Sequence, residues 1–193
     1  MKILLVTTKT NLQHFDKKYD ESLIVSDNYD FILESYWKEN KYDYIYGLGG
    51  GCVADISKYL AFKWECPLTF IPSILSTDAM FTNATAYRED NTVKYHFTKS
   101  PDETIFDDTI LSSVDYKYHA SGWCDVLSSL IACYCWKHYN DKQIDRLSNT
   151  ITNSEKLKFD ENIYNEVLQY LDCITCPNNK QNRRQLFDTL KRS

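Results

Sequence analysis

Four of the five glycines in the chain fall between residues 47 and 51, in the sequence Gly-Leu-Gly-Gly-Gly. An apolar run that predicts a strand, Tyr42–Tyr46, precedes them, and helical spacing follows over Val53–Lys63. Glycines at such a junction let the backbone approach a ligand closely. The start of the following helix presents free N–H groups and a positive dipole end to a phosphate. We therefore expect the pyrophosphate of a nucleotide to bind here, and a tight turn with positive φ is the alternative explanation.

Further motifs follow the glycine cluster in a fixed order along the chain. They read Gly49-Gly50-Gly51-Cys52-Val53-Ala54-Asp55-Ile56-Ser57-Lys58, Ile71-Pro72-Ser73, Ser76-Thr77-Asp78-Ala79 and Gly122-Trp123-Cys124-Asp125. This ordered set resembles the superfamily of iron-containing alcohol dehydrogenases and dehydroquinate synthase-like enzymes. Within it, glycerol-1-phosphate dehydrogenases are the most similar group and glycerol dehydrogenases the second. The resemblance covers roughly residues 42–140.

The resemblance implies that NAD or NADP is the cofactor. The cofactor-binding positions that it implies are Gly49, Gly50, Gly51, Asp55, Lys58, Ser73 and Ser76. Ser73 stands where relatives usually have threonine, and its hydroxyl can still donate a hydrogen bond. An exposed i,i+3 charge pair, which contributes only a few tenths of a kcal/mol, is the alternative interpretation of Asp55 and Lys58.

The resemblance also implies a catalytic position at Asp78, which matches the aspartate that meets the substrate hydroxyls in polyol dehydrogenases. A carboxylate in a loop after a strand is well placed to accept hydrogen bonds from a diol. The structural alternative is that Asp78 caps the start of the next helical segment.

Asp125 matches the aspartate ligand of the family's zinc or iron(II) ion. In relatives two later histidines complete the site, whereas the histidines of this chain are His14, His96, His119 and His138. Catalytic zinc normally takes three protein ligands. His138 follows Asp125 by 13 residues on the same predicted helix, about 20 Å away at 1.5 Å per residue. We therefore expect the metal site to be incomplete.

Two functions follow from these motifs. The first is an NAD(P)-dependent, metal-assisted oxidoreductase that acts on a small polyol or polyol phosphate. The alternative is a degenerate family member that binds nucleotide without a catalytic metal, or a gene remnant. We expect a chain that is shortened at both ends relative to the family, and a homo-oligomer is compatible with the sequence.

The elements that position these residues follow an α/β pattern in the first half of the chain. The predicted strands are Ile3–Val6, Leu23–Val25, Tyr42–Tyr46, Leu68–Ile71 and Thr104–Phe106, with a helix over Asn28–Asn40 and a hairpin over Ala86–Phe97. Beyond Asp108 only helical periodicity is visible. The sequence thus predicts a parallel-sheet nucleotide-binding domain over residues 1–108 and an all-helical domain over residues 109–193.

Composition excludes several classes of protein. The 193 residues are 43% hydrophobic and carry a net charge of −5, which favours a globular protein and gives no broad attraction to nucleic acid. No apolar run approaches the roughly 20 residues that span a bilayer. We expect a cytoplasmic protein with no membrane partner and with reduced cysteines. For the basic segment from Lys180 onward we favour a solvated helix, and a binding surface is the alternative.

Overall fold

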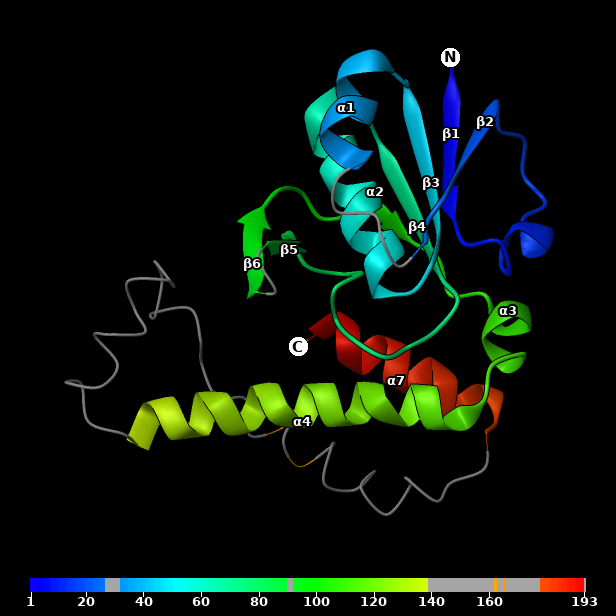
Figure 1. Ribbon diagram of the computed structural model, residues 1–193. Helices are drawn as coiled ribbons and strands as arrows, with labels where there is room; N and C mark the ends of the chain where they lie inside the picture. Colours follow the sequence, from blue (N-terminus) through cyan, green and yellow to red (C-terminus); the bar gives the residue numbers. More distant parts are fainter. Residues whose placement is uncertain (27–31, 90–91, 139–161, 163–164, 166–177, 193) are drawn as a thin grey trace.

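A parallel sheet of five strands organises the first half of the chain in the computed structural model, which describes residues 1–26, 32–89, 92–138, 162, 165 and 178–192 (Figure 1). The strands are β1 (Ile3–Thr7), β2 (Glu21–Ile24), β3 (Tyr44–Gly49), β4 (Leu68–Pro72) and β7 (Glu103–Thr104), in the spatial order β2-β1-β3-β4-β7. The order reverses between β1 and β3. Open α/β sheets bind ligands at such a switch point, beyond the carboxyl ends of the strands.

The central strands form because their apolar runs are covered on both faces. Leu4, Leu5 and Val6 of β1 are fully buried, and so is nearly all of β4. Continuous burial is typical of a parallel sheet with elements packed on both sides. All five predicted strands are found, with shifted ends. β3 runs on to Gly49, so the glycine cluster begins inside the strand, and β7 has only two residues.

Helices cover both faces of the sheet. On one face lie α1 (Ile32–Glu39) and α2 (Gly51–Trp64), side by side in Figure 1. The other face packs against the short helices η1 (Leu12–His14) and α3 (Asp108–Ser112), whose Ile110 contacts the sheet. The predicted helix over Asn28–Asn40 is present as α1, and residues 27–31 lie outside the described part of the chain.

Two further units complete the described structure. The predicted hairpin is confirmed as β5 (Ala84–Glu89) and β6 (Thr92–Phe97), which pair antiparallel as a separate sheet. The helices α4 (Tyr116–His138) and α7 (Lys180–Arg192) lie side by side next to the carboxyl end of the sheet (Figure 1). The chain is thus an α/β sheet followed by helices, as predicted. A domain boundary at residue 109 stays a prediction.

The basic C-terminal helix is docked rather than simply solvated. Leu186, Phe187 and Leu190 of α7 join the main core, and Arg183 is only 5% exposed. The expectation of a solvated helix is therefore correct only for its outer face, where Arg184, Lys191 and Arg192 are exposed. None of the helices described has the length and apolar character needed to cross a bilayer.

Candidate functional site

The glycine cluster allows close packing between β3, α2 and the neighbouring strand. A Cβ at Gly47 would lie 2.6 Å from the Phe70 ring, and one at Gly49 would lie 2.4 Å from Val53 Cγ2. Every glycine of the chain is described, and none has positive φ. The alternative of a tight turn with positive φ is therefore wrong. Gly47 and Gly49 need to be glycine because a side chain there has no space.

The first turn of α2 begins without a side-chain cap. Gly50 is the N-cap residue, in extended conformation, and has no side chain to accept from the N–H groups of the first turn. Donors of this kind, together with the positive end of a helix dipole, can bind an anion. The start of α2 lies at the switch point of the sheet, where the cofactor pyrophosphate is predicted to bind.

Ser73 and Asn11 join the ends of three strands around Gly49. The Ser73 N–H donates to the Gly49 carbonyl at 2.9 Å, and Asn11 Nδ2 donates to Ser73 Oγ at 3.0 Å. Because Ser73 Oγ already accepts a hydrogen bond, its own proton remains for another acceptor. Ser76 lies half-buried in the same loop. Sequence reasoning missed Asn11, although its place just after the first strand was a usable signal.

Asp55 and Lys58 form a buried pair, so the alternative of an exposed charge pair is wrong. Lys58 is 0% exposed and Asp55 8%. Lys58 Nζ lies 3.4 Å from Asp55 Oδ1 and donates to the carbonyls of Ala79, at 2.7 Å, and Ala84. Burial lowers the pKa of Lys58 and raises the pKa of Asp55, and the opposite charge of each partner offsets part of this effect.

The structure brings Asp78 and Asp125 together from two different elements. The backbone N–H of Asp78, in the loop after β4, donates to Asp125 Oδ2 on α4 at 3.1 Å. Burial, and secondly the Asp125 charge, raises the pKa of Asp78. No helix starts at Asp78, since the chain makes a turn there before β5, so the capping alternative is wrong.

Two residues of α4 that the sequence did not single out for this role set the position of Asp125. His119 Nδ1 accepts from the N–H of Leu75 at 3.2 Å, and Nε2 donates to the Leu111 carbonyl at 2.9 Å. Gly122 lies so close to the loop that a Cβ there would be 2.1 Å from the Leu75 oxygen. Helix α4 is thus docked on Leu75, three residues before Asp78.

The described residues do not complete a metal site. Within the described ranges, no three His, Cys, Asp or Glu side chains gather in a way that could hold a metal ion. Both ring nitrogens of His119 are engaged in backbone hydrogen bonds. His138 ends α4, about 20 Å along the helix from Asp125 at 1.5 Å per residue.

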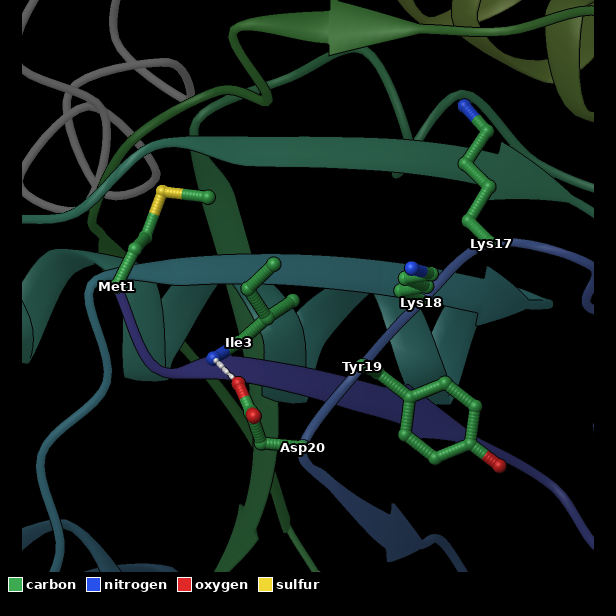
Figure 2. Close-up of a pocket in the computed structure, with 6 residues that line it drawn as sticks. All are labelled: Met1, Ile3, Lys17, Lys18, Tyr19 and Asp20. Carbon is green, nitrogen blue, oxygen red and sulfur yellow. Dashed lines mark hydrogen bonds between the residues drawn. The ribbon is translucent and has the colours of Figure 1, made fainter.

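A surface hollow lies at the opposite end of the sheet. Figure 2 shows it at the amino-terminal end of β1, where Asp20 accepts from the Ile3 N–H at 2.7 Å. Its lining residues are Met1, Ile3, Lys17, Lys18, Tyr19 and Asp20. None of the predicted site residues is among them, so the candidate site is the cluster at the carboxyl ends of the strands.

Comparisons with known proteins give one family match and several similar enzymes. The family model for iron-containing alcohol dehydrogenase matches residues 8–113. A glycerol-1-phosphate dehydrogenase [NAD(P)+] from Methanosphaera stadtmanae is 31% identical over 93 residues, which are 48% of this chain and 27% of the relative. The enzyme of that name from Methanococcus maripaludis strain C7 is 26% identical over 150 residues, 76% of this chain and 42% of the relative.

The fold has similar solved counterparts. A sulfoacetaldehyde reductase from Bifidobacterium kashiwanohense, solved in complex with NAD+, aligns with a TM-score of 0.70 at 17% identity. The alignment covers 98% of this chain and 57% of that structure. Of the two curated relatives named above, the matched residues cover 27% and 42%, so the chain spans less than half of their length.

Proposed function

The chain belongs to the iron-containing alcohol dehydrogenase family, and we propose that it binds NAD or NADP and acts as an oxidoreductase on a small polyol or polyol phosphate. The observation that carries this proposal is that one loop, the loop after β4, joins the predicted cofactor position to the predicted substrate position. The uncapped start of α2 lies at the switch point, and the loop after β4 carries both Ser73 and Asp78.

The cofactor would lie along the turn between β3 and α2. The N–H groups that follow Gly50 would donate to its pyrophosphate, and the Ser73 hydroxyl, which accepts from Asn11, would donate its proton to a neighbouring acceptor. When bound, the nicotinamide supplies the hydride acceptor or donor. The residues of this chain hold and orient it.

The substrate would lie between the loop after β4 and α4. Asp78 and Asp125 present carboxylate oxygens that accept hydrogen bonds, which suits the hydroxyl donors of a polyol. The hydrogen bond from the Asp78 N–H to Asp125 fixes the loop against the helix. Two adjacent negative charges repel a phosphate, so a polyol phosphate would bind with its hydroxyl end toward this pair.

A second candidate is a family member that binds nucleotide without turnover. It is supported by the arrangement around Asp125, where His119 uses both ring nitrogens in backbone hydrogen bonds and so cannot serve as a ligand without leaving them. This candidate has the same cofactor site as the first and differs only in that it does not catalyse a reaction.

Two measurements distinguish these candidates. Fluorescence titration with NADH and NADPH tests the shared site, and oxidation of glycerol 1-phosphate by NAD+ or NADP+ tests turnover. Binding with turnover supports the first candidate, and binding without turnover supports the second. If neither reduced nucleotide binds, both are contradicted.

A further inference from the structure

Lys58 belongs to α2, yet its ammonium group reaches the loop that carries Asp78. The side chain is fully buried, and Nζ donates to the carbonyl of Ala79, at 2.7 Å, and to that of Ala84. These carbonyls stand at the two ends of the segment that leads from Asp78 to β5. A single ammonium group therefore ties both ends of this segment to α2.

Asp55 supplies the counter-charge one helical turn earlier. Its Oδ1 lies 3.4 Å from Lys58 Nζ and is buried without a hydrogen-bond partner among the described residues. Removing two charges from water costs several kcal/mol per ion before their attraction is counted, so a buried pair is weak evidence for stability alone. The Lys58 side chain of this pair also contacts the loop through the carbonyls of Ala79 and Ala84.

We propose that Lys58 is a positioning residue for substrate binding, which fixes Asp78 beside Asp125 and makes no contact with the cofactor. The proposal rests on the proposed function, because it takes Asp78 as the group that meets the substrate. Three hydrogen bonds from other elements hold this short loop. Lys58 holds Ala79, Asp125 accepts from the Asp78 N–H, and Thr104 Oγ1 donates to the Met80 carbonyl at 3.3 Å.

The matched comparison is Lys58→Met against Lys63→Met. Both lysines lie on α2, but Lys63 is exposed, with its ammonium group over the half-buried rings of Trp37 and Tyr59. Each variant and the wild type are titrated calorimetrically with NADH and with glycerol 1-phosphate, and their thermal unfolding is recorded.

We expect Lys58→Met to bind NADH within about twofold of wild type and glycerol 1-phosphate about tenfold or more weakly, while Lys63→Met retains both affinities. A Lys58→Met protein that loses both ligands equally, or neither, would overturn the proposal. If the wild type binds NADH but not glycerol 1-phosphate, the result would contradict both the proposed substrate and this role of Lys58. A wild type that binds no reduced nucleotide contradicts the proposed function.

Two further tests apply if Lys58→Met does not fold. The double variant Asp55→Leu with Lys58→Met removes both charges, so no unpaired buried carboxylate remains, and the same loss of substrate affinity alone is expected. The second test is reductive methylation of the wild type, read by mass spectrometry. Lys58 should stay unmodified with or without NADH, while Lys63 is modified. Modification of Lys58 that NADH prevents would indicate a cofactor contact and overturn the proposal.

Discussion

The backbone N–H of Asp78 donates a hydrogen bond to Oδ2 of Asp125, 47 residues later in the chain, at 3.1 Å. This contact joins the sheet and the helices at the candidate site. It places two carboxyl groups in one partly buried region, where burial, and secondly the Asp125 charge, raises the pKa of Asp78.

Replacing Asp125 by Asn should therefore lower the pKa of the Asp78 carboxyl toward its ordinary value. The amide keeps a similar shape and an oxygen that can accept from the Asp78 N–H, but it removes the negative charge. Carbon-13 NMR of the aspartate carboxyls over a pH titration measures the change. An Asp78 pKa that stays the same or rises in Asp125→Asn would show that the two side chains do not interact as described.

Gly122→Ala should destabilise the fold by about 1–3 kcal/mol, the usual cost of forcing extra atoms into a packed site. The added Cβ would lie 2.1 Å from the Leu75 oxygen, so α4 must move away from the loop. Chemical denaturation measures the loss. Ser121→Ala is the control, because Ser121 is exposed on the same helix, and its effect should stay within about 0.5 kcal/mol. Equal stability of the two variants would contradict the close contact.

Stability should fall in mild acid because His119 is held neutral. Burial, and in smaller part the nearby Arg183 charge, lowers the His119 pKa from its ordinary value of 6.5, and the Leu111 carbonyl offsets part of this effect. The unfolded chain therefore binds a proton that the folded chain does not, and stability is lost as the pH falls below about 6.5. The loss approaches about 1.4 kcal/mol per pH unit until the lowered pKa is reached.

His119→Gln tests this prediction, since glutamine can both accept and donate without titrating. The difference in unfolding free energy between wild type and variant should shrink as the pH falls from 7 toward 5, measured by urea denaturation at each pH. A difference that is constant over this range would show that His119 titrates alike in both states.

The sequence predicted the sheet well and the docking contacts poorly, for physical reasons. Buried parallel strands such as β4 are continuous apolar runs, which can be read locally. The i,i+3 spacing of Asp55 and Lys58 is the same for an exposed pair and a buried one, so only the loop packed over α2 decides between them. Gly122 was a missed signal, because an interior helical glycine costs about 1 kcal/mol and often marks a close approach.

Arg183→Met should destabilise the protein far more than Arg184→Met. Arg183 is 5% exposed, and its Nε donates to Asp108 at 2.8 Å, which ties α7 to α3. Breaking a buried pair leaves an unpaired charge, and with Asp108 partly exposed we expect a cost of about 2 kcal/mol. Arg184 pairs with Asp188 at the surface, where such pairs contribute at most about 1 kcal/mol. Comparable unfolding free energies for the two variants would contradict the docked position of α7.

The central claim is that a nicotinamide nucleotide binds at the turn between β3 and α2, and NADH titration of a matched pair of variants tests it most directly. A Cβ at Gly50 would lie 2.9 Å from Ile74 Cγ2, so Ile74→Ala is introduced first to make room for a larger residue. Ile74→Ala alone should bind NADH as the wild type does, and Gly50→Val in that background should remain folded and bind none, because its methyl groups occupy the approach of the pyrophosphate. Equal NADH affinity in the two proteins would contradict the claim.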